Sequence, residues 1–233
     1  MPMFGFYIDS YYLILVVPAL LIAAWAQWNV SSAFRKYSRV GNVRGYTGYQ
    51  VARMILDANG LYHVQIERVA GSLTDHFDPT KSVVRLSDTV YHSTSVAAIG
   101  VAAHECGHAV QHNTGYLPIR VRSAIVPLTR IGSTLAFPIA ILGLCFGSSM
   151  LVTVGILLFT IVVAFQLVTL PVEFNASSRA LRTLSEDHIL EPGAEYDGAK
   201  RMLRAAALTY VAAMITALAQ LVRLILLANR RER

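Results

Sequence analysis

Two histidines and a glutamate stand close together in the sequence, as His104, Glu105 and His108. On a helix, residues four positions apart project from the same face, about one turn from each other. Imidazoles placed in this way can occupy two corners of a zinc tetrahedron, and the neighbouring carboxylate can accept a proton from a zinc-bound water. The pattern predicts a zinc-dependent hydrolytic site. It is only moderately specific, because an amphipathic helix whose histidines have ordinary polar partners would read the same way.

The residues around this motif favour the metal site. Val96–Ala103 are small and apolar, which predicts that the helix carrying the motif is buried. Burying two imidazoles and a carboxylate there is costly unless a metal or polar partners satisfy them. Gly107, which lies between the two histidines, would let another element approach the helix closely.

A catalytic zinc needs three protein ligands and one open position. Glu173 is the first charged residue after forty uncharged residues, from Ile131 to Leu170. If that stretch crosses a membrane twice, the chain returns to the side that it left, and Glu173 emerges on the side of His104 and His108. We therefore predict Glu173 as the third ligand, with Pro171 permitting a bend before it.

Other candidate ligands fit less well. His112 continues the spacing of the two histidines, but three ligands on one rigid helix face rarely converge on one point. Cys106 projects from the far side of the helix, which favours packing in the core. Five further residues are interpreted as cleft-lining or turn residues (Asp75, His76 and Asp78) and as exposed loop residues (Asp187 and His188).

The elements that must position this site are largely apolar. The chain is 55% apolar and 15% charged, whereas soluble domains carry about 25% charged residues, and its mean hydropathy is +0.49. Asp9 precedes the first apolar segment in place of a basic leader, so we interpret that segment as a retained anchor. Arg223 interrupts the last segment and is expected to snorkel to the interface or to pack on neighbouring helices. The predicted spans are residues 11–28, 131–147, 151–172 and, as a span or an interfacial helix, 205–229.

Residues 29–130 read as a small α+β unit that contains the motif helix. Its expected elements are a helix over 47–59 stopped by Gly60, a strand over 63–69, a turn over 75–81, a strand over 82–86 and a helix over 93–111. Residues 173–204 would add the third-ligand helix and a loop. The predicted fold class is mainly α: a polytopic membrane protein with three to four transmembrane helices and a small α+β, zincin-like domain at the membrane surface.

The charge distribution predicts the orientation in the membrane. Residues 29–130 hold eleven Lys and Arg residues and 173–204 hold five, whereas the turn at 147–149 has none. Both basic regions should face the cytoplasm, although the basic tail at 230–233 would then lie outside if the last segment spans. The net charge of +6 is not arranged for nucleic acid, since the basic residues lie beside apolar segments. The two cysteines suggest no disulfide framework.

Several separated motifs resemble the bacterial membrane-bound neutral zinc metallopeptidases, the YugP-like family. The resemblance covers nearly the whole chain and rests on residues 73–79, 83–87, 102–109, 171–177 and 179–181. It implies one zinc ion per chain, held by His104, His108 and Glu173, with Glu105 as general base.

The sequence is also similar to the wider gluzincin group, in which an aspartate four residues after the glutamate ligand orients a ligand histidine. Ser177 occupies that position here and is a neutral, weaker acceptor. Position 175 is asparagine, where the YugP-like family is expected to carry aspartate. What orients the histidines is therefore left open.

These observations predict a single membrane metallopeptidase domain over 1–233 that hydrolyses peptides or membrane proteins in the plasma membrane, with its site on the cytoplasmic side. The strand at Val83–Leu86 could pair with an extended substrate. Arg179, His112 and Tyr116 are candidate oxyanion donors. An intramembrane protease is less favoured, because the helix over 95–110 is short and ends in polar residues. The alternative of another class is a non-catalytic scaffold or transport-associated protein with a structural zinc site.

Overall fold

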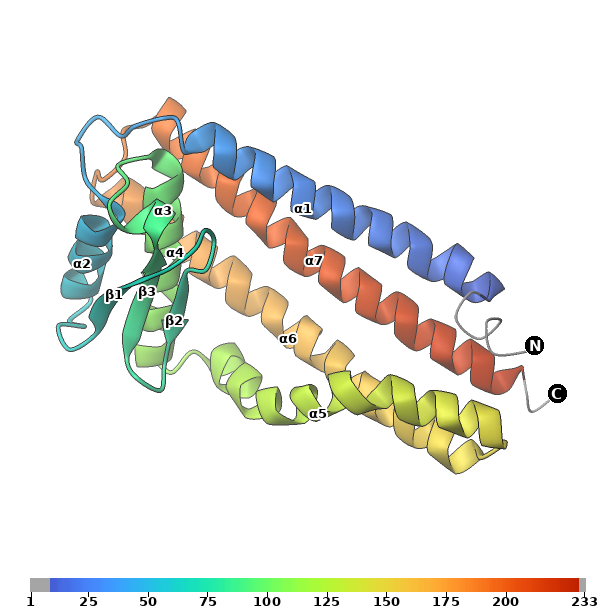
Figure 1. Cartoon of the computed structure of the whole chain (residues 1–233). Coiled ribbons are helices and arrows are strands. Elements are labelled where there is room, and N and C mark those ends of the chain that lie inside the picture. Colours follow the sequence, from blue (N-terminus) through green and yellow to red (C-terminus); the bar gives the residue numbers. More distant parts are fainter. Residues whose placement is uncertain (1–8, 231–233) are drawn as a thin grey trace. The chain divides into compact units, whose positions relative to one another are not determined.

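The computed structural model describes residues 9–230, whose helices and strands are labelled in Figure 1. After a π-helical turn over Tyr12–Val16, the helices are α1 Val17–Tyr37, α2 Gly48–Ala58, α3 Asp88–Tyr91, α4 Val96–Asn113, α5 Leu117–Phe146, α6 Ser149–Glu186 and α7 Ala194–Asn229. The strands are β1 Gln65–Val69, β2 His76–Asp78 and β3 Val83–Ser87. The described chain is therefore mainly helical with a small sheet, which confirms the predicted fold class.

Among residues 9–230, four helices are long and apolar enough to cross a membrane. They are Tyr12–Tyr37, α5, α6 and α7, and each covers one of the four predicted segments to within one residue. The helices extend well beyond those segments. In particular, α6 continues through Pro171 to Glu186, so the expected bend does not interrupt the helix. Residues 231–233 of the basic tail lie outside the described residues.

The chain forms two compact units, each assembled from segments distant in the sequence. The first comprises the described parts of Met1–Gln27, Val121–Leu170 and Thr209–Arg233. Its buried cluster includes Ala136 and Ala140 of α5 and Phe159 of α6. Small residues let α5 and α6 pack closely, since a Cβ atom added to Gly155 would lie 2.7 Å from the Cβ of Ala140.

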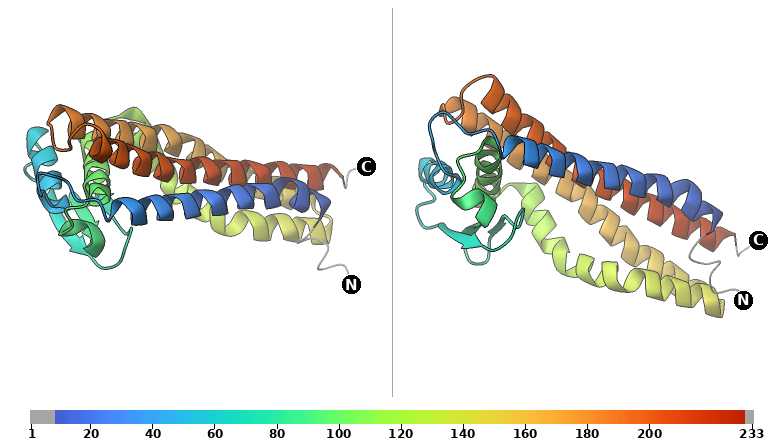
Figure 2. Two further views of the ribbon diagram at one scale, coloured as in Figure 1. Left: turned by 90° about the horizontal axis from the view of Figure 1, so that it is seen from above. Right: turned by 45° about the horizontal axis from the view of Figure 1, so that its top comes forward.

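Arg223 is paired inside this first unit, rather than snorkelling as one prediction had it. Its Nη2 and Nε atoms lie 2.7 Å and 2.9 Å from Oδ2 of Asp9. The two side chains are 8% and 9% exposed, and the guanidinium lies 5.0 Å from the centre of the Tyr12 ring. Both views of Figure 2 show the beginning of α1 beside the end of α7, which brings these residues together. An arginine in an apolar helix is thus matched by a carboxylate.

The second unit comprises Trp28–Arg120 and Pro171–Leu208, and α4 is buried along most of its length in it. Its helices begin and end where the sequence supplies caps. Ser95 begins α4 by accepting a hydrogen bond from the Ala98 amide at 3.2 Å. Thr47 and Gln50 form a capping box at the start of α2, and Gly60 follows its end in a left-handed conformation with φ of 70°. The predicted helix over 47–59 with its glycine stop is confirmed.

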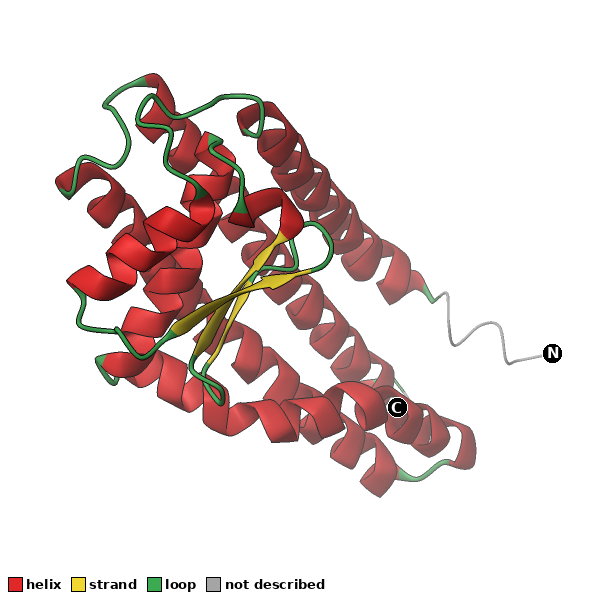
Figure 3. Cartoon of the chain, turned by 60° about the vertical axis from the view of Figure 1, so that its left-hand side comes forward, coloured by secondary structure: helices red, strands yellow, loops and turns green. Residues whose placement is uncertain are grey.

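The three strands form a sheet of order β1–β3–β2 that packs against α4 and is drawn in yellow in Figure 3. Strand β3 lies at the centre, parallel to β1 and antiparallel to β2. Two expectations are therefore wrong. Val83–Leu86 offers no free edge, because Val84 pairs with Ile66 on one side and Phe77 on the other. The segment predicted as a turn over 75–81 contains the edge strand β2, and only its second half turns, with Asp78 accepting the amides that follow.

Candidate metal centre

Three side chains from α4 and α6 converge in the second unit. His104 and His108 lie one turn apart on α4, with ring centres 4.7 Å apart and planes nearly perpendicular. The Nε2 atoms of both rings face Oε2 of Glu173, at 3.3 Å and 3.5 Å. Their side chains are 12% and 11% exposed, and that of Glu173 is 2% exposed. The residues predicted from spacing and topology are thus brought together in one buried cluster.

The separations within this cluster fit a zinc ion. Protein ligands lie about 2.0–2.1 Å from zinc in a tetrahedral arrangement, so two ligand atoms on one ion are about 3.3–3.4 Å apart. The two distances from Glu173 Oε2 to the histidine nitrogens, 3.3 Å and 3.5 Å, match that edge length. One donor atom from each residue lies within 4.8 Å of the others. The donor set of two imidazoles and one carboxylate also suits zinc.

The carboxylate also changes the protonation of its neighbour. Burial alone would lower the pKa of His108, but the hydrogen bond that its ring donates to Glu173 and the charge of Glu105 outweigh burial, so the pKa is raised above its ordinary value. In the absence of a metal, His108 therefore holds its proton more tightly than an exposed histidine.

Each histidine has a partner at its other ring nitrogen. Ser177 Oγ lies 3.1 Å from Nδ1 of His104, from the position four residues after Glu173. The serine thus contacts the histidine that an aspartate would orient. Gln111 Oε1 lies 3.0 Å from Nδ1 of His108 and belongs to a side chain that is fully buried. Sequence reasoning missed Gln111, although its place three residues after His108 on the same helix was a usable signal.

Glu105 lies on α4 beside the histidines and is 9% exposed. Its charge reaches Asp75: burial, followed by the charge of Glu105, raises the pKa of Asp75 despite hydrogen bonds from Ser87. Those bonds come from the Ser87 amide at 2.7 Å and its hydroxyl at 3.0 Å. Asp75 therefore lies near Glu105, the candidate general base, and is held in place by Ser87 at the end of β3.

The comparisons with known proteins agree with this geometry. The family model described as "Putative neutral zinc metallopeptidase" matches residues 12–229. The chain belongs to this family. It is also 46% identical, over 216 residues, to a Bacillus subtilis (strain 168) protein named "Putative membrane protease YugP", which covers 93% of this chain and 96% of that protein. No solved structure matches the chain.

Membership of the zinc metallopeptidase family thus confirms the resemblance drawn from the motifs.

The other residues considered as ligands or oxyanion donors have contacts outside the cluster of His104, His108 and Glu173. His112 is exposed, with its ring 5.9 Å from that of Phe77. Cys106 is fully buried and its thiol donates to the Ala52 carbonyl at 3.5 Å, so core packing is its role. Tyr116 donates its hydroxyl to the Pro171 carbonyl at 3.5 Å.

Four further candidates also have other contacts. Asp78 and His76 both contact Arg85, at 2.9 Å and 3.3 Å. Asp187 and His188 are exposed beyond the end of α6. Within residues 9–230, the group that could hold a metal is His104, His108 and Glu173.

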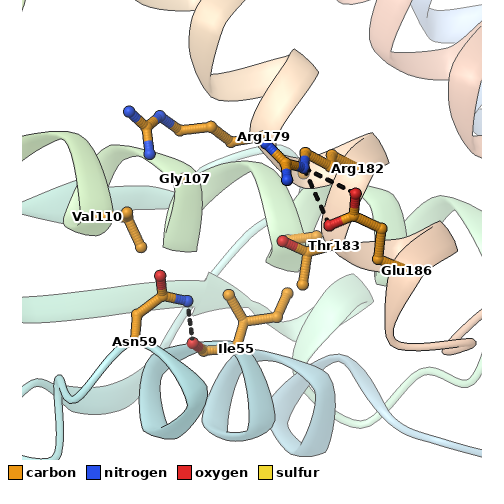
Figure 4. A pocket seen from close by; sticks show the side chains of 10 residues that line it. Ile55, Asn59, Gly107, Val110, Arg179, Arg182, Thr183 and Glu186 are labelled. Atoms are coloured by element: carbon orange, nitrogen blue, oxygen red, sulfur yellow. Dashed lines mark hydrogen bonds and ion pairs between the residues drawn. The ribbon is translucent and has the colours of Figure 1, made fainter.

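A groove of about 230 Å³ lies beside α4 in the same unit and is shown in Figure 4. Ile55 of α2 and Asn59, just after its end, line one side, and Arg179, Arg182 and Thr183 of α6 line the other. None of the three candidate ligands lines it. We therefore distinguish this groove from the candidate metal centre, although Arg179, which lines the groove, also donates to Asn175 Oδ1 at 2.8 Å.

Proposed function

We propose that this chain is a zinc-dependent membrane endopeptidase that hydrolyses peptide bonds in peptides or membrane proteins. The observation that carries the proposal is the convergence of His104, His108 and Glu173 in a buried site, with both histidine Nε2 atoms 3.3–3.5 Å from Oε2 of Glu173. Family membership supports the same chemistry. Three converging protein donors among the described residues also favour a catalytic zinc, which keeps an open position, over a structural zinc, which normally has four protein ligands.

In the proposed mechanism, His104, His108 and Glu173 would hold one zinc ion, which supplies Lewis acidity toward a water and the scissile carbonyl. Glu105 accepts a proton from the attacking water as the new C–O bond forms. It then delivers that proton to the departing amine as the C–N bond breaks. The burial of Glu105 suits this role, because a carboxylate shielded from bulk water keeps the proton for the leaving group.

Of the two edge strands, β1 and β2, the one that packs against α4 is β2, so an extended substrate would pair with β2 rather than with the central strand β3. Strand β2 lies at the end of the sheet and packs against α4, the helix that carries both histidines. A substrate strand pairing with this edge would use main-chain hydrogen bonds, which suit substrates of varied sequence. We propose that β2 aligns the substrate beside Glu105.

We further propose that the chain is a multi-pass protein of the plasma membrane with its site on the cytoplasmic side. Glu173 follows an apolar stretch that ends at Leu170, which supports a site next to a membrane surface. The many basic residues in 29–130 support the cytoplasmic side. Labelling at position 148 tests this side, as set out in the Discussion.

The proposed function is tested by Glu105→Gln in the purified full-length chain. We expect about one zinc per chain in both parent and variant, with peptide hydrolysis lost only in the variant, because the amide cannot accept the proton. Glu186→Gln is the matched control, since this exposed glutamate pairs only with Arg182 at the end of α6 and should leave hydrolysis unchanged. Undiminished hydrolysis by Glu105→Gln would show that the mechanism is wrong. Glu173→Ala should lower zinc affinity, and unchanged affinity would remove Glu173 from the ligand set.

A further inference from the structure

A chain of hydrogen bonds extends from His108 to a cationic side chain on α6. His108 Nδ1 lies 3.0 Å from Gln111 Oε1. The Gln111 amide nitrogen donates to the Val172 carbonyl at 2.8 Å and to Asn175 Oδ1 at 3.0 Å. Asn175 Oδ1 also accepts from Arg179 Nε at 2.8 Å. Every atom in this chain therefore has a partner within ordinary hydrogen-bond distance.

The direction of these hydrogen bonds is fixed from both ends. A guanidinium can only donate, so the Asn175 atom that faces Arg179 must be the carbonyl oxygen. A backbone carbonyl can only accept, so the Gln111 atom that faces Val172 and Asn175 must be the amide nitrogen. The Gln111 oxygen is then the atom that faces His108.

This direction determines which ring nitrogen of His108 keeps its proton. Because the Gln111 oxygen can only accept, Nδ1 of His108 must carry a proton in this arrangement. Nε2 is the nitrogen that faces Glu173 at 3.5 Å, and it donates to that carboxylate when it is protonated. Once a metal replaced the Nε2 proton, the ring would be in the tautomer whose Nε2 lone pair points into the candidate metal centre.

We propose that Gln111, Asn175 and Arg179 are positioning residues that fix His108 in its metal-binding tautomer. The proposal rests on the proposed function for the identity of the metal, whereas the direction of the hydrogen bonds follows from their donors and acceptors alone. Gln111 is fully buried, so reversing its amide would place its oxygen against the Val172 carbonyl with no water to relieve the contact.

The two histidines differ in this respect. The Ser177 hydroxyl beside His104 can donate or accept, so it orients that ring without selecting a tautomer. An aspartate at position 175 would accept from both Gln111 and Arg179, as the asparagine oxygen does. The departure from aspartate at this position therefore leaves the acceptor in place and removes a charge.

The experiment is a series of variants in the full-length, detergent-solubilised protein, with zinc affinity measured by competition with a chelator. Asn175→Asp keeps the acceptor and should bind zinc within about threefold of the parent. Asn175→Leu and Gln111→Met remove links of the chain and should weaken binding about 10- to 100-fold, as loss of such outer partners typically does. Arg182→Met is the matched control for Arg179→Met, because Arg182 lies on the same helix and pairs with the exposed Glu186 instead of with Asn175. Arg179→Met should weaken binding and Arg182→Met should not.

A second measurement separates loss of the His108 hydrogen bond from general damage to the fold. Nitrogen and proton chemical shifts of the His108 ring in the zinc-loaded protein should show a hydrogen-bonded Nδ1–H in the parent and in Asn175→Asp. The Nδ1–H proton should move upfield in Gln111→Met, because it has lost its acceptor. Zinc affinity and ring shifts that are unchanged in Gln111→Met and Asn175→Leu would overturn the proposal.

The peptidase proposal and the positioning proposal can be refuted independently of each other. If the zinc affinity follows the predicted series but no variant or parent hydrolyses peptides, the positioning proposal stands and the peptidase proposal does not. If Glu105→Gln abolishes hydrolysis while the series leaves zinc affinity unchanged, the positioning proposal alone is wrong.

Discussion

Gly107 sets how closely α4 approaches α6, and adding a single methyl group there should disturb the metal centre. A Cβ atom at this position would lie 2.8 Å from the Ala176 carbonyl oxygen and 3.3 Å from its carbon. Ordinary contacts begin near 3.4 Å, so the helices must separate locally by about 0.6 Å. Ala176 lies between Glu173 and Ser177, so the shift reaches the two residues of α6 that contact the histidines. Zinc–ligand distances tolerate only about 0.2 Å.

Two effects oppose each other in the stability of Gly107→Ala. Replacing a glycine in a helix by alanine stabilises the helix by about 1 kcal/mol. Overpacking against a rigid backbone costs about 1–3 kcal/mol. The metal-free protein should therefore be destabilised by at most about 2 kcal/mol. Zinc affinity, which depends on geometry, should fall more clearly, by about 10- to 100-fold.

Gly100→Ala is the control, because Gly100 lies two turns earlier on the same helix. Its added Cβ would meet the terminal methyl of Met202 at 3.0 Å, and a flexible methionine end can move away. The propensity gain of about 1 kcal/mol should then offset the small packing cost. The assay is thermal unfolding of both metal-free variants, followed by chelator competition for zinc. If Gly107→Ala binds zinc as tightly as the parent, close helix approach does not set the ligand geometry.

Two further predictions concern proton release and membrane orientation. Because Glu173 and Glu105 raise the pKa of His108, its apo-state ion pairing stabilises the metal-free fold below pH 6.5 and is lost as the pH rises through the raised pKa. Zinc requires the neutral His108 ring, so zinc binding just above pH 6.5 should release a proton, and zinc affinity should weaken as the pH falls. Calorimetry in two buffers of different ionisation enthalpy measures the proton release. If no proton is released at that pH, His108 is not the ligand with the raised pKa. Ser148→Cys, in a background with the exposed Cys145 replaced by serine, should react in intact cells with an impermeant thiol reagent applied from outside. Reaction only from the cytoplasm would reverse the proposed orientation.

The sequence predicted the parts of this molecule that depend on local spacing. The i, i+4 histidines, the glycine stop after α2 and the four apolar segments each follow from periodicity or from a single residue type. Glu173 was predicted from a count of membrane crossings, and the structure places this residue beside His104 and His108. The edge strand β2 was missed, because three residues ending in Asp78-Pro79 read as a turn and pair only through a distant strand.

What orients the histidines could not be derived in the same way, because it depends on which atoms of distant residues meet. Ser177 looked like a loss when compared with an aspartate, yet its hydroxyl reaches His104 at 3.1 Å. Gln111 read as a polar residue near the end of a helix, and only its burial and its contact with Val172 show that its amide has one allowed direction. The direction comes from obligate donors and acceptors sixty or more residues away in the sequence. A neutral serine and a neutral glutamine can therefore take the place of charged partners, because the surrounding backbone and Arg179 supply the polarity that a carboxylate would carry by itself.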